Sequence, residues 1–247
     1  MIPKIIHYCW FGGNSLPKSA VKCVNSWKKF FPDYEIKEWN ERNFNVNMCP
    51  YTKEAYERKL YAFVSDVARF FILYNEGGVY FDTDVEVIRP MGDIIEKGAF
   101  MGIEDYNFLG THCPQINPGL GMGAEKGNAF VNKMLEHYMT AILIDKSTGT
   151  LAGGTVVGHT TRMLLEAKMK KDEGVQKVAD FILYPPEYFN PFNDATGRLI
   201  KTANTRSIHW YSKTWIDKPM VYYHITRFFH RFFGIKSLEK LKCLLHK

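Results

Sequence analysis

Apolar residues recur along the chain with alternating strand and helix periods. Residues 2–11 form an apolar run that ends at Gly12 and Gly13, which predicts a buried first strand. Apolar side chains then fall at helical spacing over residues 17–31, and residues 35–39 alternate like a strand. A strand, a helix and a strand in this order predict the start of an open, mostly parallel α/β sheet.

The same patterns extend the α/β prediction to the rest of the chain. A strongly apolar helix is expected over residues 60–76, before the pair Gly77 and Gly78. Further helices are predicted over residues 128–144 and 155–171, with a loop rich in glycine and threonine between them. The remaining expected strands are residues 79–81, 85–88, 100–103, 119–124, 181–184 and 206–210.

Charge separates the last thirty residues from this body. Residues 1–217 hold 25 Lys and Arg against 25 Asp and Glu, whereas residues 218–247 hold seven basic residues and one acid. The whole formal charge of +6 therefore lies in the tail. A neutral body argues against nucleic acid as a partner. Because no linker divides the body, we expect one domain over residues 1–217 and a basic tail over residues 218–247.

The tail carries an amphipathic pattern. Ile225, Phe228, Phe229, Phe232 and Phe233 fall at i, i+3, i+4, i+7 and i+8, which predicts one apolar helix face. Such a face either packs on the body or a partner subunit, or lies on an anionic membrane surface. The chain shows no signal-peptide pattern and no apolar run of about 18 residues. The expected location is therefore cytoplasmic, peripheral on the inner membrane face.

Two carboxylates, Asp82 and Asp84, follow the strand predicted at residues 79–81. In an extended chain, side chains two residues apart point the same way. Both carboxylates could then share one hard cation, such as Mg²⁺ or Mn²⁺, whose open positions take phosphate oxygens. The alternative for this short motif is a solvated turn after a strand.

Two further charges lie in the preceding apolar helix. Asp66 and Arg69 are three residues apart and so share one helix face. Charges in so apolar a segment need a partner or a cleft. The two residues form either an intrahelical ion pair or a site for sugar hydroxyls, since Arg donates hydrogen bonds and Asp accepts them.

Three motifs together resemble glycosyltransferase family 32, which includes yeast mannosyltransferases and bacterial capsular polysaccharide transferases, and the related glucosylating domains of clostridial toxins. The first is Ile-Pro-Lys-Ile-Ile-His-x-x-Trp-x-Gly-Gly at residues 2–13. The second is Ser-Asp-x-x-Arg…Gly-Gly-Val-Tyr-x-Asp-x-Asp at residues 65–84. The third is Ile-His-x-x-x-x-Thr-Trp at residues 208–215, which contains His-x-x-x-x-Thr-Trp. The resemblance covers residues 1–217. It implies a GT-A type, Rossmann-like fold with a mixed, mostly parallel sheet flanked by helices.

The resemblance also implies an activity. Such a protein is a retaining, metal-dependent hexosyltransferase of polysaccharide biosynthesis, capsule biosynthesis included. Its cofactor would be Mn²⁺ (or Mg²⁺), and its donor a nucleotide-sugar, in the toxin-like case a UDP-hexose. The acceptor would be a glycan, and the amphipathic tail suits a lipid-linked one.

The resemblance assigns the donor sugar and base to five residues. Trp10 would stack on the base, although a packed core tryptophan is the alternative. Asp66 and Arg69 would contact the hexose. Tyr80 would contact the donor, and Asn117, in a glycine-rich segment similar to the family's middle region, would face the sugar.

The resemblance implies that the other matched residues bind the metal and the diphosphate. Asp84 would be a direct ligand, and Asp82 would reach the metal mostly through water. His209 is the candidate third ligand, with a packed histidine as the alternative. Trp215 would donate its indole N–H to the β-phosphate, and Thr214 stands where the family usually has serine.

Two other functions are compatible with parts of this pattern. A Mg²⁺-dependent phosphohydrolase would use Asp82 as its nucleophile, but such enzymes usually have Thr or Val where this chain has Glu86. A non-catalytic, membrane-docked glycan-binding protein would need no intact carboxylate pair, and both pairs here are intact.

Overall fold

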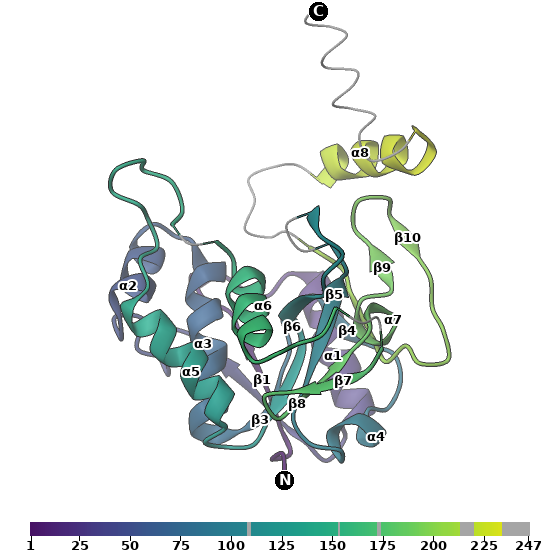
Figure 1. Ribbon diagram of the computed structural model, residues 1–247, viewed down its shortest axis with the longest axis horizontal. Coiled ribbons are helices and arrows are strands. Elements are labelled where there is room, and N and C mark those ends of the chain that lie inside the picture. Colours follow the sequence, from purple (N-terminus) through teal and green to yellow (C-terminus); the bar gives the residue numbers. More distant parts are fainter. Residues whose placement is uncertain (108–109, 153, 172–173, 213–219, 234–247) are drawn as a thin grey trace, which may run out of the picture.

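A mixed sheet of seven strands forms the centre of the computed structural model (Figure 1). Its strands, in spatial order, are β2 (Glu35–Trp39), β1 (Ile5–Cys9), β3 (Gly78–Tyr80), β6 (Gln115–Ala124), β5 (Phe100–Asp105), β8 (Phe181–Tyr184) and β7 (Gln176–Val178). Five strands run in one direction, and β6 and β7 run against them. The expected mixed, mostly parallel α/β sheet is confirmed. The structure describes residues 1–107, 110–152, 154–171, 174–212 and 220–233.

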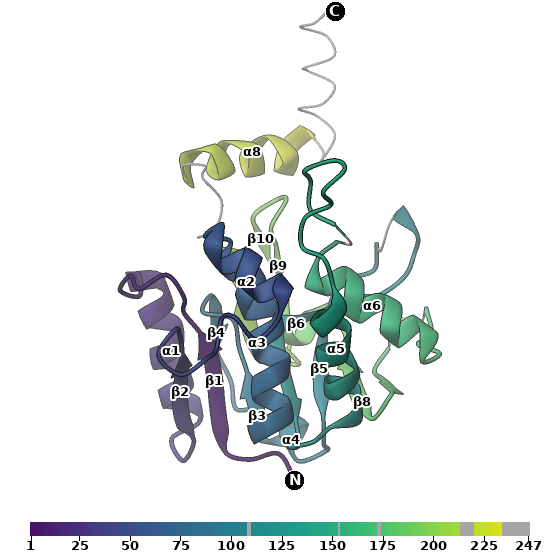
Figure 2. The ribbon, with the colours of Figure 1, turned by 90° about the vertical axis from the view of Figure 1, so that its left-hand side faces the viewer.

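Helices cover both faces of this sheet, and each face has its own apolar core (Figure 2). Fully buried Phe70 belongs to the core under one helix layer, and fully buried Trp27 to the core under the other. The first layer holds α2 (Pro50–Glu57), α3 (Tyr61–Glu76), α5 (Ala129–Thr140) and α6 (Val156–Glu166). The second holds α1 (Lys18–Phe30), α4 (Gly92–Ile95) and α7 (Pro186–Phe189).

Two small antiparallel ribbons complete the body. Strand β4 (Val85–Val87) pairs with β11 (Ser207–His209), and β9 (Phe192–Asn193) pairs with β10 (Arg198–Leu199). The first ribbon matters for the site because His209 lies opposite Val85, directly after the two carboxylates.

The predicted strands and long helices are all present, with shifted ends. The helix expected over residues 155–171 ends at Glu166, and the strand expected from residue 119 already begins at Gln115. That strand contains Asn117, Pro118 and Gly119, residue types that disfavour strands, so its first half carried no signal. The pattern did not predict the short elements α2, α4, α7, β7, β9 and β10.

The described part of the tail is helix α8 (Met220–Phe233), which rests on the β9–β10 hairpin (Figure 1). Nη2 of Arg227 lies 2.6 Å from Oδ1 of Asp194, and the guanidinium stands over the Phe192 ring. Nδ1 of His230 lies 3.2 Å from the Ala195 carbonyl oxygen. Residues 234–247 lie outside the described residues, so a separate tail unit over 218–247 stays a prediction.

Candidate active site

The site begins at the turn between β3 and β4, which carries Asp82 and Asp84. The extended geometry expected for these residues is wrong, because the Val85 amide donates to the Asp82 carbonyl oxygen at 3.0 Å and closes a turn. The turn arises because β3 ends at Tyr80 in the central sheet while β4 leaves that sheet to pair with β11. Both carboxylates still reach one place.

That place is completed by His209 on β11. Nε2 of His209 lies 3.0 Å from Oδ1 of Asp84, and the amide and hydroxyl of Ser212 donate to Oδ2 of Asp84 at 2.8 and 3.1 Å. One ligand atom from each of Asp82, Asp84 and His209 lies within 4.8 Å of the other two. The structure therefore brings together the three residues that the sequence nominated for a metal.

The protonation states of this cluster follow from its burial. Burial opposes ionisation of Asp84, but His209 and the Ser212 hydrogen bonds lower the pKa of the carboxyl to about 2. Burial by itself would lower the pKa of His209. The effect of the Asp84 carboxylate is larger and raises this pKa to about 9. The imidazole therefore carries a proton at neutral pH, and a metal ion held here would displace it, because only neutral imidazole is a ligand.

Two carboxylates and an imidazole fit Mn²⁺ or Mg²⁺ by their donor chemistry. Asp82 and Asp84 would supply the hard oxygen ligands that both ions prefer, and His209 would supply a nitrogen that suits Mn²⁺ better than Mg²⁺. Nδ1 of His209 is buried without a hydrogen-bond partner among the described residues. The imidazole is thus held through Nε2, the atom that faces the carboxylates.

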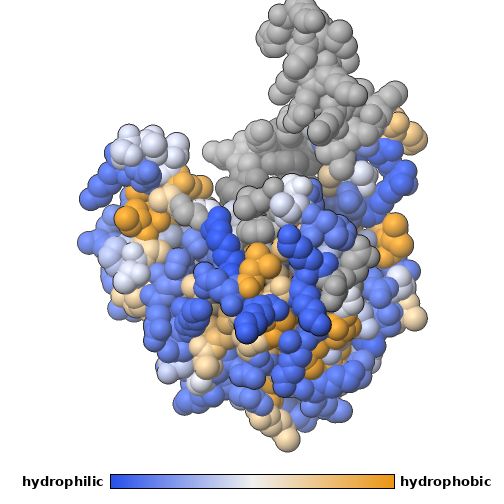
Figure 3. Space-filling model, viewed as in Figure 1, coloured by the Kyte–Doolittle hydropathy of each residue, from blue (hydrophilic) through white to orange (hydrophobic). Residues whose placement is uncertain are grey.

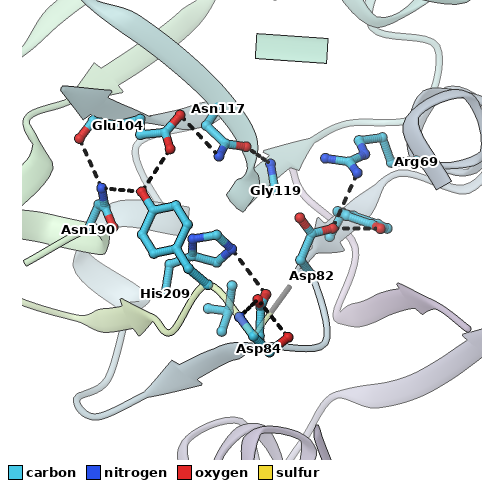
Figure 4. Close-up of polar contacts among 12 residues, drawn as sticks. Arg69, Asp82, Asp84, Glu104, Asn117, Gly119, Asn190 and His209 are labelled. Atoms are coloured by element: carbon cyan, nitrogen blue, oxygen red, sulfur yellow. Dashed lines mark hydrogen bonds and ion pairs between the residues drawn. The ribbon is translucent and has the colours of Figure 1, made fainter. Parts of the chain in front are cut away.

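Helix α3 brings a buried ion pair to the same turn. Nη2 of Arg69 lies 2.9 Å from Oδ1 of Asp66 and 3.3 Å from Oδ1 of Asp82. The Tyr80 hydroxyl donates to the same Asp82 oxygen at 3.0 Å, and the guanidinium stands over the Tyr80 ring. The predicted shared helix face is confirmed, and it is turned toward the Asp82 turn (Figure 4).

The burial of this pair leaves capacity for a ligand. The side chains of Arg69 and Asp66 are 4% and 10% exposed. Burial raises the pKa of Asp66 to about 7 despite Arg69, whose single guanidinium also serves Asp82. Nη1 of Arg69 has no hydrogen-bond partner within the part of the chain that the structure describes. A buried, unpaired N–H is costly unless a ligand accepts from it.

Strand β6 forms the opposite wall through Asn117 and Gly119. The Asp82 amide donates to the Gly119 carbonyl oxygen at 3.1 Å, and the Gly119 amide donates to Oδ1 of Asn117 at 2.8 Å. A Cβ at position 119 would overlap the Asp82 carboxylate, with Cγ of Asp82 2.8 Å away. Glycine is therefore required for Asp82 to lie against this strand.

Trp10 follows the last residue of β1, which runs parallel to β3. The carboxyl ends of the two strands meet at one edge of the sheet, the usual place for ligands in open α/β sheets. The indole N–H donates to the Asn14 carbonyl oxygen at 2.7 Å. Thr214 and Trp215 lie outside the described residues, so their roles stay predictions.

The structure adds four polar residues to this neighbourhood. Glu104 and Asn190 are labelled in Figure 4, and Tyr211 and Ser212 follow from their hydrogen bonds to Glu104 and Asp84. None belongs to a motif of the sequence. Tyr211 and Ser212 lie within the spacer of the His-x-x-x-x-Thr-Trp motif, which is the one signal that could have drawn attention to them.

Part of this site lies in a region that matches a known family. Residues 17–101 match the family model described as "Glycosyltransferase sugar-binding region containing DXD motif". Over these residues the chain resembles this family. The matched segment contains the Asp66–Arg69 pair on α3 and the Asp82–Asp84 turn, so the family region coincides with the centre of the site.

Proteins of similar sequence are found in yeast and in a giant virus. The chain is 35% identical over 140 residues to inositol phosphoceramide mannosyltransferase 3 of Schizosaccharomyces pombe, covering 55% of this chain and 37% of that relative. It is 35% identical over 106 residues to the uncharacterized glycosyltransferase L373 of Acanthamoeba polyphaga mimivirus, covering 40% and 42%. The chain thus matches about two fifths of each relative's length.

Among solved structures, the chain is similar to two glycosyltransferases. The PaToxG glycosyltransferase has a TM-score of 0.47 at 19% identity, covering 67% of this chain and 71% of that one. A glycosyltransferase involved in the glycosylation of the major capsid of PBCV-1 has a TM-score of 0.46 at 13% identity, covering 86% and 95%.

The geometry does not favour the phosphohydrolase alternative. A nucleophilic Asp82 would need a free oxygen facing a phosphoryl group, with a metal beside it. Oδ1 of Asp82 instead takes the Tyr80 hydrogen bond and the Arg69 ion pair, and Oδ2 lies against Gly119.

Proposed function

We propose that this chain transfers a hexose from a nucleotide-sugar, a UDP-hexose by preference, to a glycan acceptor. The observation that carries the proposal is the junction at Asp82. On one side its carboxylate forms a cluster with Asp84 and His209. On the other side it contacts the buried Arg69. A metal-binding group and a sugar-binding group therefore adjoin, as a sugar diphosphate requires.

The hexose is held by the Asp66–Arg69 pair in this proposal. The unpaired Nη1 of Arg69 donates to a sugar hydroxyl, and the Asp66 carboxyl lies next to it. Asn117 contacts the sugar from β6, and Trp10 stacks on the base at the edge of the sheet. Sugar hydroxyls both donate and accept, so a mixed Asp, Arg and Asn lining suits them.

Mn²⁺ (or Mg²⁺), when bound by Asp84, Asp82 and His209, would neutralise charge on the departing nucleoside diphosphate. The chain's own residues supply the rest. Ser212 holds the Asp84 carboxylate in place, Arg69 holds the Asp82 carboxylate and the sugar, and Trp215 donates to the β-phosphate. We propose retention of configuration, with the acceptor attacking on the face of the leaving group and without a stable covalent intermediate.

For the acceptor we propose a lipid-linked glycan of a cell-surface polysaccharide, such as a capsule. Support comes from the name of the S. pombe relative, an inositol phosphoceramide mannosyltransferase, because ceramide is a lipid. Helix α8 adds to it. Arg227 and His230 hold the helix on the β9–β10 hairpin, while Ile225, Phe228 and Phe232 are 52%, 58% and 65% exposed.

We therefore propose a peripheral position on the inner, cytoplasmic face of an anionic membrane, with α8 as the contact. Figure 3 shows a mainly hydrophilic body in this view, with apolar residues exposed at the α8 end. None of the helices that the structure describes is long and apolar enough to cross a bilayer. Phenylalanine side chains beside basic ones suit a helix that lies in the interface.

Replacing both Phe228 and Phe232 with serine is expected to weaken binding to phosphatidylglycerol-containing vesicles by about a hundredfold, since each buried phenylalanine contributes about 1.5 kcal/mol. Cosedimentation measures the binding. Val21→Ser on α1, where Val21 is 41% exposed, is the matched control and should bind as the wild type does. Equal binding by the double variant would rule out α8 as the contact.

The function is tested by a hydrolysis screen of UDP- and GDP-sugars with Mn²⁺, because slow donor hydrolysis needs no acceptor. We expect release of UDP from a UDP-hexose, and its loss when a chelator removes the metal. The anomer of the first released sugar, followed by NMR, tests retention. If no nucleotide-sugar is hydrolysed and none binds in calorimetry, a non-catalytic glycan-binding protein replaces this proposal.

A further inference from the structure

Glu104 enters the site through an irregularity of the sheet. Strands β5 and β6 pair at Ile103 with Ile116 and at Asp105 with Gln115, so Glu104 is an extra residue on β5 that has no partner on β6. Such a bulge changes the direction of a side chain, and bulges are frequent next to active sites. Here it turns Glu104 toward Asn117 and Tyr211 (Figure 4).

Glu104 is half-buried and receives donors from two different parts of the chain. Oε1 accepts from the Tyr211 hydroxyl at 2.8 Å, and Oε2 lies 3.5 Å from Nδ2 of Asn117. Nδ2 of Asn190 donates to both the Glu104 carbonyl oxygen and the Tyr211 oxygen, at 3.0 and 2.8 Å. Burial raises the pKa of Glu104, against the hydrogen bonds from Tyr211 and Asn117.

The Tyr211 contact holds the metal side of the site. Tyr211 stands between His209 and Ser212, which both contact the Asp84 carboxylate, and its ring centroid lies 4.2 Å from that of His209. Tyr211 has a φ of +49°, a left-handed conformation that a tyrosine rarely adopts. A hydrogen bond from its hydroxyl offsets this strain and keeps the segment in place.

The Asn117 contact holds the sugar side. With Oδ1 accepting from the Gly119 amide and Nδ2 directed at Glu104, the orientation of the Asn117 amide is determined. Gly119 in turn accepts from the Asp82 amide. Glu104 thus contacts both walls of the site, through Asn117 on β6 and through Tyr211 after β11.

We propose that Glu104 is a positioning residue that sets Asn117 and the His209–Ser212 segment in one geometry. It acts through these groups and does not contact the donor. The test by kcat rests on the proposed function, because it needs donor hydrolysis. The test by Mn²⁺ affinity does not depend on that function.

Two variants separate the two contacts. Glu104→Gln keeps an acceptor for Tyr211 but turns an NH₂ group toward the NH₂ group of Asn117. We expect kcat for donor hydrolysis to fall on the order of tenfold to a hundredfold, with KM, Mn²⁺ affinity and melting temperature close to those of the wild type. Tyr211→Phe removes the hydrogen bond to Glu104 together with the one from Asn190, and we expect its Mn²⁺ affinity to fall about tenfold.

Asp105→Asn is the matched control, because it removes the neighbouring exposed carboxylate and leaves this network intact. It should keep wild-type kcat and Mn²⁺ affinity. Unchanged kcat in Glu104→Gln, or a loss matched by a fall in melting temperature, would overturn the proposal. If the wild type hydrolyses no donor, the proposed function fails instead. Calorimetry with Mn²⁺ alone then still tests the positioning role, because an Mn²⁺ affinity of Tyr211→Phe equal to that of the wild type would overturn it.

Discussion

Asp84→Ala is expected to lower Mn²⁺-dependent donor hydrolysis by about a thousandfold, the equivalent of about 4 kcal/mol of lost transition-state stabilisation. Asp84 is the carboxylate on which the site converges, since His209 and Ser212 both bind it. Its removal takes away one ligand and releases the imidazole that supplies another. The measurement is kcat/KM for release of the nucleoside diphosphate, with Mn²⁺ affinity from calorimetry alongside it.

Folding must be separated from chemistry in this experiment. Alanine removes the buried partner of His209, whose pKa then falls because burial opposes the charged imidazole, and loss of this ion pair costs about 3 kcal/mol of stability. Asp84→Asn keeps the side-chain shape and the oxygen that faces Ser212, so it should lose the activity and keep more of the stability. Asp33→Asn removes an exposed carboxylate and serves as control. Wild-type turnover in Asp84→Asn would refute the metal role of Asp84.

Gly119→Ala is expected to lower kcat/KM for donor hydrolysis by about a hundredfold while the protein stays folded. The new methyl group would occupy the position of the Asp82 carboxylate, so that side chain must rotate away from Arg69 and from the cluster. The variant changes no polar group and no charge. It therefore tests where the Asp82 carboxylate lies, because the carboxylate itself is still present.

A second glycine provides the comparison. Gly92→Ala at the start of α4 would place its methyl group 3.7 Å or more from its neighbours, so activity and melting temperature should stay at the wild-type level. For both variants, kcat/KM for donor hydrolysis and the melting temperature are measured. Full activity in Gly119→Ala would mean that Asp82 is not needed in the position where the structure holds it.

The sequence predicted the central fold because apolar periodicity reports burial, and burial here follows the sheet and its two helix layers. The residues of α3 show this well. Its apolar face, its end at Gly77 and the shared face of Asp66 and Arg69 are all local properties of one helix, and all are confirmed. Short elements such as α2 and the β9–β10 hairpin escaped because too few residues repeat in them to form a period.

The candidate site was predictable where its chemistry lies in a motif. Asp82 and Asp84 come together as expected, although through a turn. His209 could be nominated by resemblance alone, because 125 positions separate it from Asp84 and only the β4–β11 pairing brings them together. Glu104 carried no signal, since a bulge in β5 is a property of strand pairing and not of local sequence.

The sequence by itself thus determined the α/β class, the charged face of α3 and the two carboxylates after β3, because each depends on residues within a few positions of one another. Tertiary structure decided which oxygen of Asp82 meets Arg69, which nitrogen of His209 meets Asp84, and that Glu104 links the two walls. Those contacts join strands distant in the chain, and their geometry follows from register, a bulge and a glycine that lets Asp82 approach β6.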